Sequence, residues 1–172
     1  PMYELGRLAL NEGKGAEASE LLLKAGKNGS WGAYVLLGRM SEKGKTVKKD
    51  PAAAARYYKM AADAGDPAGC NELGRLIEKG SGIAQSYTNA YRLYALGAEG
   101  GNGEALYNVG RMEIYGLGTE KNERAGLAKL KKAAEMGESE AMTALATFYM
   151  EGKIVAANRG EALRLYREAA ER

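Results

Sequence analysis

A chain of 172 residues is long enough for one compact domain or one continuous array of repeats. Its apolar residues (45%) suffice for a core and its charged residues (27%) are typical of a soluble surface, whereas a net charge of +3 is too small to favour nucleic-acid or membrane-surface binding. Histidine, the commonest general base and transition-metal ligand, is absent, and no apolar stretch approaches the ~20 residues of a membrane-spanning helix.

Among the apolar residues Ala, Leu and Tyr dominate while Val, Ile and Phe are scarce, a bias that favours helices over strands. The chain nevertheless carries 24 Gly against 3 Pro. A glycine inside a helix costs roughly 0.5–1 kcal/mol relative to alanine, so the glycines require a structural reason. The lone cysteine, Cys70, permits no intramolecular disulfide, and we expect it to be a small buried or half-buried residue.

The first predicted helix pair lies in residues 1–30 and contains the Leu5-Gly6 dipeptide, which marks the first helix of each copy. Its second half reads SELLLKAGKNG, after a connection about four residues shorter than in later copies. The dipeptide then recurs every 36 residues, as Leu37-Gly38, Leu73-Gly74, Val109-Gly110 and Leu145-Ala146. A period of this length is typical of helical repeat proteins.

The second pair, residues 31–66, shows the signals that delimit each helix. Ser30 precedes the first helix, and Gly44 falls where that helix must stop. Asp50 precedes the second helix and is followed by Pro51, at a position where proline suits a helix start. These signals predict two helices joined by a short loop.

Three further pairs, residues 67–102, 103–138 and 139–172, repeat the signals in register. The first helices are preceded by Asp66 and Asn102 and end at Gly80, Gly116 and Gly152, and the second helices are preceded by Ser86, Asn122 and Asn158. Side chains of Asp, Ser and Asn accept hydrogen bonds from the unpaired N–H groups at a helix start. The columns therefore predict the same two helices in each unit.

Other columns predict how the two helices of a unit pack. Gly6, Gly38, Gly74 and Gly110 lie in the middle of the first helices, where a missing side chain lets the paired helix approach closely. In the second helices, Tyr58, Tyr94, Leu130 and Tyr166 form one column and Ala61, Gly97, Ala133 and Ala169 another. We expect the tyrosines to pack between helices.

A two-helix unit cannot bury its apolar face alone, so neighbouring units must stack. The predicted fold is therefore all-α, a right-handed superhelical solenoid of about five 36-residue helix-turn-helix repeats that forms one array over residues 1–172. Such an array has one concave and one convex face.

Each unit carries a small residue, then Leu-Gly, then a closing Gly and an Ala-x-x-x-Tyr-x-x-Ala-Ala-x-x-Gly segment. The pattern is seen in AAARYYKMAADAG (53–65), ALYNVGRMEIYGLG (105–118) and EALRLYREAA (161–170), and the whole chain resembles the Sel-one-like repeat, a relative of the tetratricopeptide repeat. The resemblance implies a scaffold or adaptor that binds a partner protein. It also implies two alternatives, a bacterial immunity-type protein that inhibits a toxic effector and a scaffold of an export complex.

A cysteine-rich bacterial branch of that family staples each unit with a disulfide, and the lone cysteine excludes this chain from it. The resemblance alone favours a bacterial periplasmic or secreted location slightly over the cytoplasm. The chain opens with PMYELG, already inside a helical pattern, so the sequence leaves the presence of an export signal open.

In the tetratricopeptide-like solenoids that this chain resembles, the first helices line the concave face. The residue after each Leu-Gly pair would project into the groove, and it is Arg7, Arg39, Arg75 and Arg111, then Thr147. Four residues earlier, on the same helical face, lie Tyr3, Val35, Asn71, Tyr107 and Thr143. Arginine and tyrosine are enriched at interface hot spots, and arginine binds carboxylates through two hydrogen bonds. Apart from Thr147, these residues form the predicted partner-binding surface, for an acidic segment or a C-terminal carboxylate.

Ion pairing within the array is the alternative role for this arginine column. Glutamates stand three residues away from three of its members: Glu4 from Arg7, Glu42 from Arg39, and Glu72 and Glu78 from Arg75. Such pairs link adjacent turns of a helix and would neutralise the column. The sequence leaves both roles open.

The positive excess is confined to residues 31–66, which carry seven Lys and Arg against four Asp and Glu. Four of the lysines, Lys43, Lys45, Lys48 and Lys49, lie in or beside the loop between the helices, as a solvated loop or a contact for an acidic partner. Trp31, the only tryptophan, starts the first helix of this unit, as an exposed anchor or packed over the preceding unit.

The sequence favours a binding module over an enzyme, and we predict no catalytic residue, cofactor or metal site. The glycine pairs at 80–82 and 116–118 resemble parts of a phosphate-binding loop, but their register assigns them to the connections between helices. Nothing singles out a carboxylate pair such as Glu104 and Glu140 for catalysis. Stacking on copies of itself is a further alternative, although we expect the chain alone to be monomeric.

Overall fold

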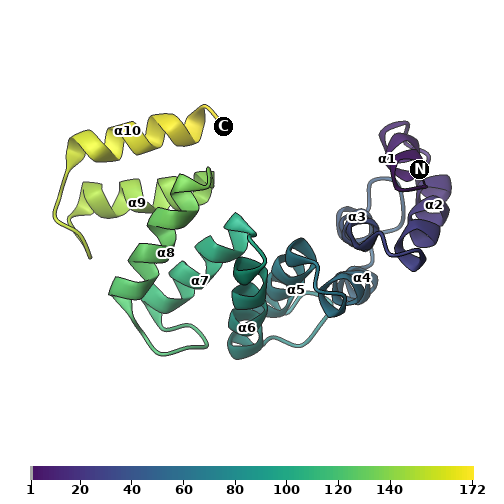
Figure 1. The fold of residues 1–172 in the computed structure, drawn as a ribbon, viewed down its shortest axis with the longest axis horizontal. Coiled ribbons are helices and arrows are strands. Elements are labelled where there is room, and N and C mark those ends of the chain that lie inside the picture. The colour runs from purple at the N-terminus through teal and green to yellow at the C-terminus, as the bar shows by residue number, and fades with distance from the viewer. Residues whose placement is uncertain (1) are drawn as a thin grey trace.

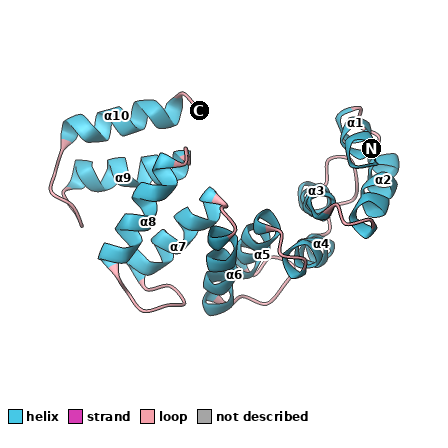
Figure 2. Cartoon of the chain, in the orientation of Figure 1, coloured by secondary structure: helices cyan, strands magenta, loops and turns pink. Residues whose placement is uncertain are grey.

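The computed structural model describes residues 2–172, which form ten helices and no strand (Figure 2). The helices are α1 Met2–Asn11, α2 Gly15–Lys27, α3 Trp31–Lys43, α4 Pro51–Asp63, α5 Pro67–Lys79, α6 Tyr87–Glu99, α7 Gly103–Tyr115, α8 Glu123–Glu135, α9 Ser139–Glu151 and α10 Arg159–Ala170. They follow one another along a curved ribbon from α1 to α10 (Figure 1). The predicted all-α solenoid is confirmed.

Each unit is a helix pair, and the pairs stack in chain order. The most extensive contacts lie within the pairs, and each second helix then contacts the first helix of the next pair. Successive first helices also contact one another directly, α3 with α5, α5 with α7 and α7 with α9. This packing brings the first helices together on the inner side of the curve, and we refer to that side as the concave face.

Side-chain caps define most of the helix starts, as the sequence predicts. Asp66 accepts a hydrogen bond from the N–H of Gly69 at the start of α5 (2.8 Å), and Asn102 accepts one from Ala105 at the start of α7 (2.7 Å). All four second-helix caps also form, from Asp50, Ser86, Asn122 and Asn158. The predicted cap at Ser30 is wrong in one respect: α3 begins after it, but its side chain makes no capping hydrogen bond.

This difference between caps gives a direct test. We expect Asp66→Ala to lower the free energy of unfolding by about 1 kcal/mol, because it leaves an N–H of α5 without its acceptor. Ser30→Ala is the matched control and should change stability by less than about 0.5 kcal/mol. Urea denaturation followed by circular dichroism measures both, and equal losses would contradict the assignment of the caps.

The ends of the first helices follow the glycine column. Gly44, Gly80, Gly116 and Gly152 all adopt left-handed backbone conformations, with φ between 66° and 70°. Residues other than glycine rarely adopt this conformation. The glycines therefore end each first helix in the same way and set the direction of the following loop.

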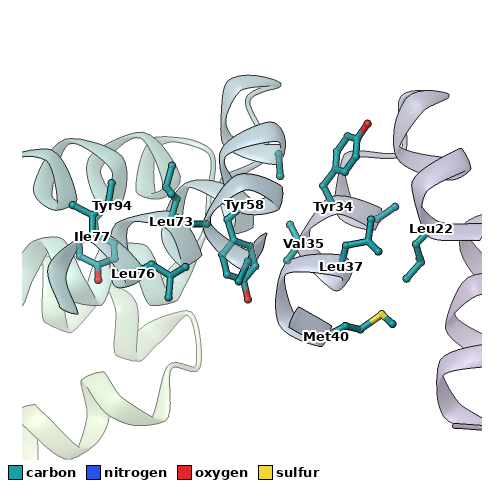
Figure 3. Packing of buried hydrophobic residues seen from close by; sticks show 14 of the residues in the cluster. Leu22, Tyr34, Val35, Leu37, Met40, Tyr58, Leu73, Leu76, Ile77 and Tyr94 are labelled. Atoms are coloured by element: carbon teal, nitrogen blue, oxygen red, sulfur yellow. The ribbon is translucent and has the colours of Figure 1, made fainter. Parts of the chain in front are cut away.

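The mid-helix glycines face the aromatic column of the paired helix. A Cβ placed on Gly38 would overlap the ring of Tyr58, and one on Gly74 would lie 3.0 Å from the ring of Tyr94. Both tyrosine side chains are fully buried and belong to the packed residues drawn in Figure 3. The glycine therefore creates the space that the tyrosine fills, which is the structural reason for glycine inside the first helices.

The core has two parts that meet at α7. One cluster of buried residues runs from α1 to Met112 of α7, and the other begins at Ile114 and continues to α10. Cys70 is buried, as predicted, and burial raises the pKa of its thiol. Trp31 remains 42% exposed and stacks on Tyr34, with 6.4 Å between the ring centroids.

The outer surface of α1 departs from the pattern of the other units. Met2, Leu5 and Leu8 are exposed, although the equivalent positions in α3 are Tyr34, Leu37 and Met40, which are buried in the core (Figure 3). In α3 these side chains contribute to the packing between units.

Candidate functional site

The predicted arginine column lies along the first helices, and ion pairs between units link three of its members. Arg75 of α5 pairs with Glu42 of α3, and its second partner is Glu72 on its own helix, with 3.0 Å between Nη2 and Oε2. Glu72 also reaches back to Arg39 of α3, with 2.8 Å between its Oε1 and Nη2 of the arginine. Two arginines and two glutamates thus form one neutral cluster across the joint between units two and three.

The next joint repeats part of this arrangement. Nη2 of Arg111 in α7 donates to both carboxylate oxygens of Glu78 in α5, at 2.8 and 2.7 Å. The two pairs Arg75–Glu42 and Arg111–Glu78 have the same sequence separation of 33 residues. Both joints therefore carry a pair between an arginine and the glutamate three residues beyond the arginine of the preceding unit.

A buried tyrosine completes each of these pairs. The hydroxyl of Tyr58 donates to Oε2 of Glu42 (3.1 Å), and that of Tyr94 donates to Oε2 of Glu78 (2.9 Å). Burial, with nearby glutamates, raises the pKa of both phenols far above its ordinary value, so they stay protonated donors. Each glutamate therefore connects the second helix of its own unit with the first helix of the next.

The Glu42 carboxyl gives this joint a pH dependence. Partial burial alone would raise its pKa, but the hydrogen bond and charge of Arg75 outweigh that effect and hold the pKa below its ordinary value of 4.5. A depressed carboxyl pKa contributes stability that is complete above the unfolded value and is lost as pH falls through the folded value. The ionised carboxylate is the form that both Arg75 and Tyr58 recognise.

We therefore expect Glu42→Gln to be less stable than the wild type at neutral pH, and the difference in unfolding free energy to shrink as pH falls below 4.5. Urea titrations of both proteins across this range measure the difference. A difference that stays constant with pH would show that the carboxylate charge does not stabilise the joint.

The joint between units four and five is apolar instead. Ile114 occupies the position of Glu42 and Glu78, Leu130 that of the two tyrosines, and Thr147 that of the arginine. Ile114 and Leu130 are almost completely buried. The hydroxyl of Thr147 lies 3.0 Å from that of Tyr166 in α10.

The other residues of the predicted surface differ in their accessibility. Arg7 is exposed and pairs with Glu4 (3.1 Å), while Tyr3 and Tyr107 are half-buried and Thr143 is exposed. Val35 and Asn71 are only 5% and 1% exposed, so their placement on the accessible surface is corrected. Val35 belongs to the core, and Asn71 of α5 accepts a hydrogen bond from the buried Asn108 of α7 (3.1 Å).

Two depressions open on this face. The first, of about 510 Å³, is lined by Arg39, Lys43 and Lys49, by the ion-paired cluster and by Glu104 of α7. The second, of about 370 Å³, lies between α7 and α9 and is lined by Tyr107, Ser139, Glu140, Thr143 and Ala144. Tyr107 and Thr143 were predicted from the sequence, but the hollow was not, because its remaining lining residues lie outside the arginine column.

The register of the helix pairs and their inner face agree with a known repeat. The sequence pattern of the Sel1 repeat matches residues 31–66, 67–102, 103–138 and 139–172. The chain belongs to the Sel1 repeat family. Sel1 repeat proteins are generally scaffolds for protein–protein interactions, and none of the described helices of this member is long and apolar enough to cross a membrane.

Solved structures share the solenoid. A Sel1 repeat protein from Oxalobacter formigenes superposes with a TM-score of 0.86 at 28% identity, over 98% of this chain and 69% of that one. A protective antigen with this fold from uropathogenic Escherichia coli gives 0.78 at 33% identity, over 90% of this chain and 33% of that one. An immunity protein from Pseudomonas aeruginosa superposes with a TM-score of 0.66 at 27% identity, over 88% of this chain and 56% of that one.

The chain thus spans about a third of the length of the antigen and somewhat more than half that of the immunity protein. A comparison with curated protein sequences gives no match.

Proposed function

We propose that this Sel1 repeat array is a protein-interaction module that binds a segment of a partner protein on its concave face. The observation that carries the proposal is the pair of depressions: accessible charged side chains line the first, and half-buried Tyr107 with polar side chains lines the second. Arginine and tyrosine are the side chains most enriched where interfaces gain their binding energy.

The depression beside α3 supports recognition of a carboxylate. Arg39 keeps 46% of its side chain exposed despite its pair with Glu72, and the exposed Lys43 and Lys49 line the same depression. Arg75 and Arg111 are more deeply placed, and Glu42 and Glu78 already neutralise them. An acidic segment or a C-terminal carboxylate would therefore bind at Arg39 and the two lysines rather than along the whole column.

A double substitution tests this part of the face. The protein captured by the chain from native lysate, once purified, should bind the variant Lys43→Glu/Lys49→Glu at least about tenfold more weakly, because two attractive charges become repulsive. Arg92→Glu, a reversal of an exposed charge on the second helix α6, is the control and should bind as the wild type does. Isothermal titration calorimetry measures both, and unchanged binding by the double variant would remove the carboxylate site.

An immunity function is the second candidate, favoured by the likeness to the Pseudomonas immunity protein. In that case the partner would be a toxic effector encoded beside this gene, and the chain would block it by direct binding. Co-expression of the chain should then restore growth to cells that produce the neighbouring gene product. Growth arrest that persists despite a stable complex would exclude this candidate.

Structural assembly is the third candidate, favoured by the exposed Met2, Leu5 and Leu8 of α1. A self-stacking array would show a mass that rises with concentration in light scattering. We expect the chain alone to remain monomeric, and a rising mass would favour assembly.

A further inference from the structure

The concave face changes its chemistry between α7 and α9, where the repeat departs from its own pattern. The ion pair and tyrosine of the earlier joints are replaced by Ile114, Leu130 and Thr147. One residue further along α7, Tyr115 stands where earlier units have Lys43 and Lys79, and it is 58% exposed. Compared with the earlier joints, the joint between α7 and α9 thus has buried apolar side chains and an accessible aromatic ring in place of charged groups.

The hollow between α7 and α9 lies beside this apolar joint. Tyr107 and Ala144 line both this hollow and a narrow extension of about 70 Å³, which reaches Ile114, Tyr115 and Phe148. Half-buried Tyr107 and exposed Thr143 leave room at the surface, while the extension ends against buried aliphatic and aromatic carbon. The extension has the polarity that an aliphatic side chain requires, and burying such a side chain is worth roughly 1.5–3 kcal/mol.

Carboxylates cluster beside this hollow at the N-terminal ends of α7 and α9. Glu140 lines the hollow, and Glu104 and Glu138 lie near enough for their charges to interact. Among the described residues, none of the three forms a salt bridge within 4.0 Å.

A purely structural role would make these acidic groups helix-start residues stabilised by the helix dipoles. Glu138 makes no capping hydrogen bond to its own helix α9, and its carboxylate lies against Gly103, the first residue of α7. Partial burial and the charges of Glu104 and Glu140 instead raise the pKa of Glu138 above its ordinary value. Glu104 already interacts with Arg39, whereas Glu138 and Glu140 repel each other, so a cation placed at these two carboxylates would lower their repulsion.

Arg111 is the cation nearest to the opposite end of the hollow from Glu140. Arg111 lines the narrow extension, but its charge is directed to Glu78. It lies seven residues, or roughly 10 Å along the helix, from Glu104. The surface therefore offers an apolar position near Tyr115 and a negative position at the N-terminal end of α7, roughly three turns away.

We propose that this hollow binds an aliphatic side chain of a partner segment, with a neighbouring lysine or arginine of the segment paired with Glu138 and Glu140. The inference rests on the proposed function, because it assigns the partner chemistry for one end of the concave face. Glu104 lies between this hollow and the depression at Arg39, so the variants that test the two sites are Lys43→Glu/Lys49→Glu at one and Glu140→Lys and Tyr115→Ala at the other.

Labelled peptides test the assignment. The probe is a fluorescein-labelled peptide with one leucine between two lysines and glycine-serine ends, and its binding is followed by fluorescence anisotropy and by amide shifts in NMR spectra. We expect saturable binding that shifts the amides of Tyr107, Tyr115 and Thr143. Replacing the leucine by alanine should weaken binding about tenfold or more, and replacing the lysines by glutamates should abolish it.

Protein variants locate the two contacts separately. Glu140→Lys should weaken binding of the lysine peptide at least about tenfold, and Tyr115→Ala should weaken it severalfold while circular dichroism stays unchanged. Glu99→Lys, which reverses an exposed charge at the end of α6, is the matched control and should bind as the wild type does.

Four results would overturn the proposal. Three are the absence of saturable shifts at these amides, equal binding of the lysine and glutamate peptides, and wild-type affinity in Glu140→Lys. The fourth is a shift of the same amides when the protein alone is concentrated, because a second copy would then occupy the hollow. Loss of the carboxylate site in Lys43→Glu/Lys49→Glu, with the peptide still bound, would leave this proposal standing.

Discussion

Tyr58→Ala should lower the free energy of unfolding by about 3–5 kcal/mol, the loss typical of truncating a fully buried aromatic side chain. The side chain of Tyr58 has no exposed surface and fills the space over Gly38. Its hydroxyl also donates to Glu42, which joins the next unit through Arg75. The substitution therefore leaves a cavity inside one unit and weakens the joint to its neighbour.

Two companions separate these contributions. Tyr58→Phe keeps the ring and should cost only about 0.5–1.5 kcal/mol, the net value of one hydrogen bond. Met60→Ala, on the exposed side of the same helix, is the control and should change stability by less than about 0.5 kcal/mol. Urea denaturation measures all three, and equal losses in Tyr58→Ala and Met60→Ala would contradict the central place of this ring in the core.

Gly38→Ala is the second large effect, and its sign is opposite to helix propensity. Alanine is favoured over glycine inside a helix by about 1 kcal/mol, yet a Cβ at this position would overlap the ring of Tyr58. Overpacking of a filled core typically costs about 1–3 kcal/mol. We therefore expect net destabilisation, because the ring is buried on all sides and cannot move away without disturbing α3 or α4.

Gly32→Ala on the same helix is the matched control. A Cβ there would come no closer than 3.8 Å to any neighbouring atom, the hydroxyl of Tyr3. This variant should therefore be as stable as the wild type or slightly more stable. Thermal unfolding followed by circular dichroism compares the two, and a Gly38→Ala protein as stable as Gly32→Ala would show that the helices do not meet as closely as the structure indicates.

The fold could be predicted from the sequence because each structural requirement recurs in register. Left-handed glycines such as Gly80, caps such as Asp66 and the glycine–tyrosine contact of Gly74 with Tyr94 each depend on local geometry. Local requirements repeat with the unit, so they appear as columns. The missing cap of Ser30 shows the limit, since a suitable residue type does not ensure the side-chain orientation.

The candidate site was less predictable, because its chemistry depends on contacts between units. Spacing within one helix suggested Glu42 as a partner for Arg39, whereas Glu42 pairs with Arg75 in the next unit. The signal was present as a shared separation of 33 residues between arginine and glutamate. The joint at Ile114 could also have been noticed, since Leu130 breaks the aromatic column at the corresponding place.

The accessible surface followed from the sequence only in part. Helical spacing put Val35 and Asn71 in one column with Tyr107 and Thr143, but Val35 packs into the core and Asn71 is buried against Asn108 of the next first helix. Equivalent positions thus acquire different environments along the solenoid. This difference directs attention to the C-terminal half of the concave face, where tyrosine and threonine remain accessible.

Binding on the concave face is the central claim, and hydrogen exchange of the chain with and without its captured partner tests it most directly. The structure places α3, α5, α7 and α9 together on that face. We predict that the partner slows amide exchange in these first helices, most strongly around Arg39 and Tyr107, and leaves α4, α6 and α8 unchanged. Protection confined to the second helices would contradict the claim.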